Sequence, residues 1–151
     1  MRFLALAPLL TLLGCSSDRI AQLEKENREL RVELESVKLD SKERCSRQAR
    51  IEYEALGWKE EERKGTLVHL TNHFNTKTRT CFMLIDSIIA DRTGALLTMG
   101  LMDAFEGKSY AKYAGKGNNL VTCKVTLSTG KESDCHSSDE FDSLVNPYME
   151  E

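Results

Sequence analysis

The sequence has no block of like charges and no long apolar run. Its 21 basic and 24 acidic residues are interspersed and give a formal net charge of −3. A basic patch with interleaved aromatic residues is missing, so we expect no nucleic-acid partner. The apolar run from Phe3 to Leu13 spans about eleven residues, whereas a stable transmembrane helix needs about 20. That run is therefore too short to be a membrane anchor.

Catalytic signatures are also missing from the sequence. The carboxylates of Asp86, Asp91, Asp103 and Glu106 are scattered and offer no obvious pair for acid–base chemistry. The segment Gly115–Gly117 has too few glycines for a phosphate-binding loop. A Cys–His nucleophilic pair needs a thiol, which oxidation removes. We therefore expect a protein that is not an enzyme and has no cofactor.

The N-terminal segment has the regions of a cleaved signal peptide, in the usual order. Met1 and Arg2 give a positive start, the apolar run follows, and Gly14 and Cys15 come directly after it. An apolar run of this length suits the core of a signal peptide. The segment resembles the lipobox of bacterial lipoproteins, with a Leu three residues before the Cys and a small residue just before it. The resemblance covers residues 1–15 only, and Leu13 stands where the family usually has a smaller residue.

This resemblance implies how the chain is processed. Residues 1–14 would be removed as a signal peptide between Gly14 and Cys15, and 15–17 would form a lipidated N-terminus with palmitate-type chains that hold it in a membrane. The protein would then lie in the cell envelope and face the periplasm. Ser16 in place of Asp implies the outer membrane of a Gram-negative host. A secretory leader followed by a chance Cys is the alternative.

Residues 18–64 are dominated by charged side chains and are predicted to be helical, with a coiled coil mainly over 18–44. Ser17 or Asp18 would cap the helix, and Gly65 would end it. A heptad pattern gives an apolar seam that fades after Val37. The seam positions are Ile20, Leu23, Asn27, Leu30, Leu34 and Val37.

The residues that flank this seam favour a parallel homodimer. Opposite charges occupy successive g and e positions in three pairs, namely Arg19–Glu24, Glu26–Arg31 and Glu33–Lys38. An Asn at one a position usually fixes the register and favours two strands. The alternative is a single amphipathic helix that packs on its own domain.

Four cysteines remain once Cys15 carries lipid. They are Cys45, Cys81, Cys123 and Cys135. An even number in an exported chain predicts two disulfides. Cys123 and Cys135 flank a predicted hairpin, and this pairing leaves Cys45 for Cys81, a closure that would add about 3–4 kcal/mol. A bond between the Cys45 side chains of two chains is the alternative, because Cys45 lies beside the seam.

Residues 66–151 hold most of the aliphatic and aromatic side chains and predict a small disulfide-stapled domain. The predicted strands are 81–90, 95–102, 109–113, 120–127 and 132–135. A final helix begins at Ser137 or Ser138, with Glu140 at capping-box spacing from Ser137. The expected fold is α+β: a long coiled-coil helix, a small antiparallel sheet of four or five strands and a C-terminal helix. Segments 73–75 and 140–149 are similar to uncharacterised exported bacterial proteins, which implies no activity.

Two histidines suggest an alternative role. On a helix, His69 and His73 would face one side and bind zinc with a third ligand such as His136. However, Leu70, Thr71 and Asn72 between them offer no zincin-type Glu, so we expect no metal. The expected function is a membrane-anchored, non-catalytic structural or interaction module of the envelope with an unknown envelope partner. A small-ligand or metal-binding periplasmic module is the alternative.

Overall fold

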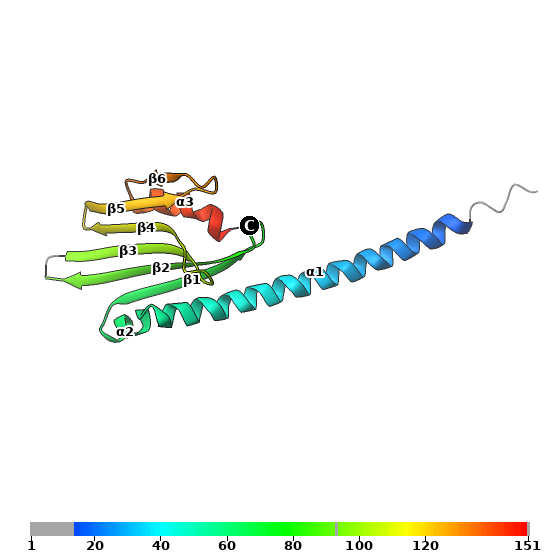
Figure 1. Ribbon diagram of the computed structural model, residues 1–151, viewed down its shortest axis with the longest axis horizontal. Helices are drawn as coiled ribbons and strands as arrows, with labels where there is room; N and C mark the ends of the chain where they lie inside the picture. Colours follow the sequence, from blue (N-terminus) through cyan, green and yellow to red (C-terminus); the bar gives the residue numbers. More distant parts are fainter. Residues whose placement is uncertain (1–13, 93, 151) are drawn as a thin grey trace, which may run out of the picture. The chain divides into compact units, whose positions relative to one another are not determined.

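The protein is α+β, as expected (Figure 1). This computed structural model describes residues 14–92 and 94–150. Helix α1 (Gly14–Ala55) and helix α2 (Trp58–Arg63) precede the sheet, and helix α3 (Ser138–Met149) follows it. The strands are β1 (Leu67–Asn75), β2 (Thr80–Asp91), β3 (Gly94–Asp103), β4 (Ser109–Lys116), β5 (Asn119–Thr126) and β6 (Glu132–Asp134).

The chain divides into two compact units, one up to Leu39 and one from Asp40 onward. We call residues 14–39 the stalk and residues 40–150 the head. The sequence analysis set the domain boundary at residue 66, whereas the compact unit of the structure begins at Asp40. Cys45, Ala49 and Tyr53 recur at helical spacing, are almost fully buried and belong to the core of the head. The second part of α1 is therefore a structural element of the head.

Helix α1 differs from the predicted helix at both ends. Ser17 and Asp18, the predicted caps, already lie within the helix. It ends at Ala55, because Gly57 adopts a φ of 82° in the left-handed region that glycine tolerates. The helix predicted to run to residue 64 is thus interrupted, and α2 is a separate element. None of the helices formed by the described residues is long and apolar enough to cross a membrane.

The six strands follow one another in chain order as an antiparallel meander. The strand that the sequence prediction missed is β1. Successive side chains of a strand point to opposite faces, so each strand contributes to two layers. On β2, Phe82 faces a core with α3, while Cys81 and Met83 face a second core with α1. The sheet therefore lies between α3 on one face and the C-terminal part of α1 on the other.

The core between the sheet and α3 contains most of the buried aromatic side chains. Phe82 packs edge-on against Tyr110 and Tyr148, with ring centroids 5.2 and 5.1 Å apart. Phe141 and Val145 of α3 are fully buried against the same core. Together these contacts fix α3 across the sheet.

Both ends of α3 are capped. Ser137 is the N-cap and accepts a hydrogen bond from the Glu140 backbone at 3.1 Å, which confirms the predicted spacing. At the other end, the buried Asn75 amide donates to the carbonyls of Pro147, Tyr148 and Glu150 at 3.2, 3.2 and 3.4 Å. The Asn75 side-chain oxygen accepts from the backbone of the turn after β1. Asn75 thus joins the β1–β2 turn to the end of α3.

Candidate functional site

The four cysteines that follow Cys15 form two pairs at disulfide distance. The Cα atoms of Cys45 and Cys81 are 5.3 Å apart, and those of Cys123 and Cys135 are 5.1 Å apart. All four side chains are buried. The alternative bond between the Cys45 side chains of two chains is wrong, because Cys45 lies in the head core and pairs with Cys81. One pair therefore ties α1 to β2, and the other closes the β5–β6 hairpin.

The predicted leader, residues 1–13, lies outside the described residues. Gly14 and Cys15 begin α1, but their side chains are also outside the described part of the chain. Lipidation of Cys15 and cleavage after Gly14 therefore stay predictions.

The apolar seam of the stalk is exposed to solvent. Leu23, Leu30 and Leu34 keep 50%, 62% and 54% of their surface accessible, and Ile20 and Val37 are similar. The Asn27 amide donates to the Leu23 carbonyl at 3.0 Å within its own helix. The predicted residues thus form an exposed apolar stripe, interrupted by Asn27, which can be buried against another helix.

The histidines do not form the predicted zinc pair. His69 and His73 lie on β1, a strand, where four residues span about 13 Å at about 3.3 Å per residue. That separation is too large for two ligands of one zinc ion, so the helical arrangement is wrong. In the described part of the chain, no three His, Cys, Asp or Glu side chains are grouped to hold a metal.

Strands β1 and β2 and helix α3 instead bring together one histidine and two carboxyl groups. His69 lies opposite Asp86 in the β1–β2 register. Burial raises the pKa of Asp86; His69 opposes this effect and the carboxylate of Asp142 adds to it. Burial, followed by repulsion from Asp139, also raises the pKa of Asp142. The result is a cluster in which the charged form of Asp86 is disfavoured.

A groove of about 510 Å³ lies on the sheet face that also carries α1. Leu56 and Trp58 line one side of it, at the end of α1 and the start of α2. Gly100 and Ala114 line its floor, where their small size leaves the strands uncovered. Lys112 lines the groove from β4.

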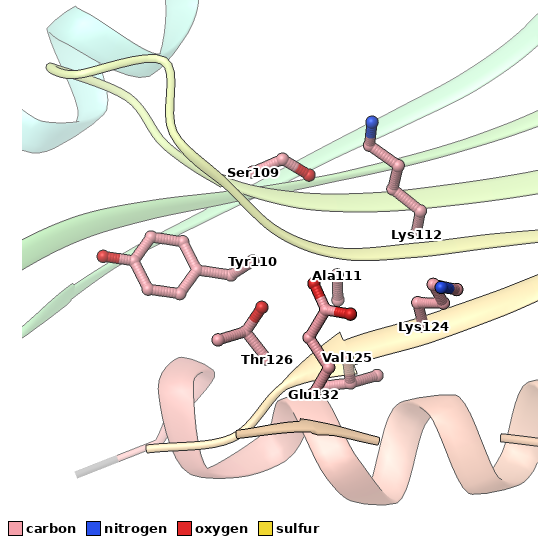
Figure 2. A pocket seen from close by; sticks show the side chains of 8 residues that line it. All are labelled: Ser109, Tyr110, Ala111, Lys112, Lys124, Val125, Thr126 and Glu132. Carbon is pink, nitrogen blue, oxygen red and sulfur yellow. The ribbon is translucent and has the colours of Figure 1, made fainter. Parts of the chain in front are cut away.

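A second hollow of about 240 Å³ adjoins this groove, since Ser109, Ala111 and Lys112 line both. Figure 2 shows Lys112 and Lys124 extending from neighbouring strands, with Glu132 and Tyr110 also lining the hollow. The two lysines are direct cross-strand partners. Lys124 also lies opposite Asp134 on β6, and Glu132 lines the same hollow, so this surface carries charges of both signs.

The sequence prediction missed this groove entirely. The sequence does contain a signal for the groove, because small or polar side chains alternate with apolar ones along these strands. Those on the α1 face are Thr98 and Gly100 on β3, Ala114 on β4 and Thr122 on β5. Small or polar residues at every second position indicate a sheet face without a buried core. The sequence does not indicate that Trp58 lines a groove, because a tryptophan directly after Gly57 could equally be a residue of the hydrophobic core.

Comparison with family models, with curated proteins and with solved structures finds no significant match to this chain.

Proposed function

We propose that the protein is a membrane-anchored lipoprotein of the cell envelope that acts as a non-catalytic structural or interaction module. Lipid on Cys15 would hold the stalk at the membrane, with the head in the periplasm. In a Gram-negative host the membrane would be the outer one, as Ser16 implies. Two buried cysteine pairs support an oxidising compartment outside the cytoplasm.

The observation that carries this proposal is the exposed seam of the stalk. An apolar side chain left in water gives up about 1.5–3 kcal/mol of burial free energy, so a stripe of five such side chains favours association. The matched g and e charges and Asn27 support a parallel homodimer. Attachment of every chain to one membrane by the same end would raise the local concentration and impose the parallel orientation.

The test compares variants on and off the seam. Leu30→Lys with Leu34→Lys places two charges in the seam, whereas Val32→Lys with Leu39→Lys places them at f positions, with Val32 and Leu39 at 72% and 69% exposure. Sedimentation of the chain from Ser16 onward should show a dimer for the parent and for the f-position variant, and a monomer for the seam variant. A monomer in all three would exclude the dimer.

The lipid anchor has its own test. Mass spectrometry of protein purified from its host should find an N-terminus at Cys15 that carries acyl chains, and Cys15→Ser should release the protein from the membrane. An unacylated chain that begins at Met1 would contradict the proposal.

A second candidate function is small-ligand binding in the head. The groove of about 510 Å³ favours it, because ligand sites are usually apolar hollows of about 300–1,000 Å³. Trp58 is the single tryptophan of the chain and lines this groove, so its fluorescence would report binding directly. Saturable emission changes with an added amphiphile such as dodecanoate would support this function.

A further inference from the structure

Phe105 is an exposed aromatic residue on a connection that the head holds firmly. It lies between β3 and β4 and keeps 54% of its surface accessible. The buried carboxylate of Asp103 accepts hydrogen bonds from the backbone N–H groups of Phe105 and Glu106 at 2.8 and 3.3 Å. An exposed ring on a fixed backbone loses little conformational freedom when a partner covers it, and this preorganisation favours binding.

The same connection is attached to the rest of the head through Ala104. The Ala104 N–H donates to the Cys81 carbonyl at 2.8 Å, and the Ala104 carbonyl accepts from the Gln48 side chain of α1 at 3.1 Å. Cys81 is also paired with Cys45 of α1. Helix α1, the start of β2 and the β3–β4 connection therefore meet at one place, beside Phe105.

Two hollows of about 330 and 140 Å³ adjoin Phe105. Arg44 and Phe105 line both of them. The larger is also lined by Ser41, Phe74 and Arg79, and the smaller by Arg47, Gln48 and Ile51. All of these residues belong to the head. Among the described residues, none with an acidic side chain lines either hollow, so the surface combines aromatic rings with positive charge.

The positive charge that is available to a partner comes from Arg44 and Arg79. Arg47 is already paired with Glu43 at 3.0 Å. Arg44 and Arg79 are exposed, and neither forms an ion pair within residues 14–92 and 94–150. Arginine presents a planar fork of N–H donors that matches the two oxygens of a carboxylate. The surface is therefore complementary to acidic side chains.

The backbone at Arg79 supports a role for its side chain. Arg79 has a φ of 56° and is the one non-glycine residue in the described part of the chain with a positive φ. Glycine adopts this conformation without steric cost, whereas a side chain does not. The turn before β2 thus keeps an arginine at a position where glycine would fit the backbone better.

We propose that this surface, defined by Arg44, Arg79 and Phe105 and called the Arg–Phe site below, binds an acidic segment of a partner protein. The segment carries carboxylates on both sides of an apolar side chain. The carboxylates would pair with Arg44 and Arg79, and the apolar side chain would enter the larger hollow against Phe74 and Phe105. Exposed aromatic and arginine side chains are the residues that most often dominate protein interfaces.

A protein segment suits the Arg–Phe site better than an anionic membrane surface does. Membrane-binding patches usually carry about 4–8 Lys or Arg residues, and this site has two that are unpaired. A flat bilayer would also leave the hollows beside Phe105 unfilled. The inference rests on the proposed role of the head as an interaction module and names the chemistry of the partner, but it uses neither the stalk dimer nor the lipid anchor.

Titration with a synthetic peptide tests the site. The probe is a capped peptide of about ten residues with glutamates on both sides of a central leucine, and the matched peptide has glutamine in place of each glutamate. In NMR spectra of the chain from Ser16 onward, the acidic peptide should shift the backbone amide signals of Arg44, Arg79 and Phe105 saturably. The glutamine peptide should bind about tenfold more weakly, because it forms no charged pair with the arginines.

Substitutions in the Arg–Phe site should weaken the acidic peptide selectively. Phe105→Ala and Arg44→Ala should each raise the dissociation constant about fivefold or more. Arg44→Lys keeps the charge but loses the fork, and should fall between Arg44→Ala and the parent. The controls are Val121→Ala, at an apolar side chain with 67% exposure, and Arg92→Ala, at an exposed arginine after β2; both should bind as the parent does.

Arg79→Gly separates binding from stability. It removes one arginine from the site and should weaken the acidic peptide about fivefold. The same change relieves the left-handed backbone at this position, so the thermal unfolding midpoint should increase. Opposite changes in affinity and stability would support a binding role for the side chain, whereas a higher midpoint with unchanged affinity would remove Arg79 from the proposed site.

The remaining outcomes decide the inference as a whole. If the acidic peptide shifts no signals, or if Phe105→Ala binds it as tightly as the parent, the inference is overturned. If the chain binds phosphatidylglycerol vesicles through Phe105 but does not bind the peptide, the site faces a membrane and the inference is overturned as well. A monomeric parent or an unacylated Cys15 would contradict the proposed function without changing the peptide titration, so the two failures are distinguishable.

Discussion

The stalk and the head use one helix in two different ways. Between residues 18 and 39 almost every side chain of α1 is exposed, including the apolar seam. From Cys45 onward the same helix buries one face, and Cys45 and Ala49 have no accessible surface. The head thus buries its part of α1 within the chain, whereas the described side chains between residues 18 and 39 are almost all exposed. The Glu-, Lys-, Arg- and Leu-rich composition favours a helix throughout α1, while packing on the sheet covers only its second part.

The largest expected effect comes from a cavity in the hydrophobic core of the head, which should destabilise the head and leave the stalk unchanged. Phe82→Ala removes a fully buried ring that contacts Tyr110 and Tyr148, and should lower the free energy of unfolding by about 3–5 kcal/mol. Denaturant unfolding monitored by Trp58 fluorescence would measure this change. The helical signal of the stalk should persist after the head unfolds, and its loss in the same transition would show that the units are coupled.

The covalent tie between α1 and the sheet gives the next largest effect. Cys45→Ala with Cys81→Ala opens a loop of 36 residues and should cost about 3–4 kcal/mol. Cys123→Ala with Cys135→Ala opens a loop of 12 residues and should cost slightly less, about 3 kcal/mol. Thermal unfolding of both double variants would rank them. If the second variant lost more stability than the first, packing around each disulfide, rather than loop closure, would dominate its contribution to the free energy of unfolding.

Removal of the Asn75 amide tests how the head holds its last helix. Asn75→Ala leaves three carbonyls at the end of α3 without their shared donor, and should lower the free energy of unfolding by about 1–3 kcal/mol. Hydrogen exchange should increase mainly in α3 and in the β1–β2 turn. Asn72→Ala on the same strand is the control, and a similar effect there would contradict the specific role of Asn75.

The smallest effect concerns the charge of Asp86. Because burial raises its pKa in the folded state, the folded protein binds more protons than the unfolded chain just above pH 3.8, and stability increases as the pH falls through that window. Asp86→Asn should therefore be more stable than the parent at pH 7, and the difference should shrink toward pH 3.5. Urea unfolding at both values checks this, with the exposed Asp134→Asn as control. If the stability difference between Asp86→Asn and the parent does not change with pH, the charge of Asp86 is not its cause.

Most strands of the head and its last helix follow from local sequence patterns. The strands β2 to β5 carry β-branched and apolar runs separated by turns, and the C-terminal helix has a capping sequence, so these elements follow from local patterns. Strand β1 was missed because the i, i+4 spacing of His69 and His73 also fits one face of a helix. The alternation of His69, Thr71 and His73 with Val68 and Leu70 was the available signal for a strand.

The head boundary was harder to predict than the strands. Cys45 and Ala49 are small, and Tyr53 is amphipathic, so the buried face of α1 does not stand out in a charged helix. Their burial depends on the sheet that forms later in the chain. The groove likewise depends on where α1 ends relative to β3 and β4, which is set by tertiary packing rather than by local sequence.

If the chain is anchored at Cys15 as we propose, the bond between Cys45 and Cys81 has a mechanical consequence. A force applied along α1 reaches Cys45 and passes through the disulfide to Cys81, at the start of β2. The residues between the two cysteines form a closed loop and carry no tension, so α2 and β1 cannot be drawn out while the bond is intact. Reduction of the bond would let the residues between Cys45 and Cys81 be extended as well. In a force-extension measurement, the reduced protein should therefore show a longer contour-length increase on unfolding than the oxidised protein.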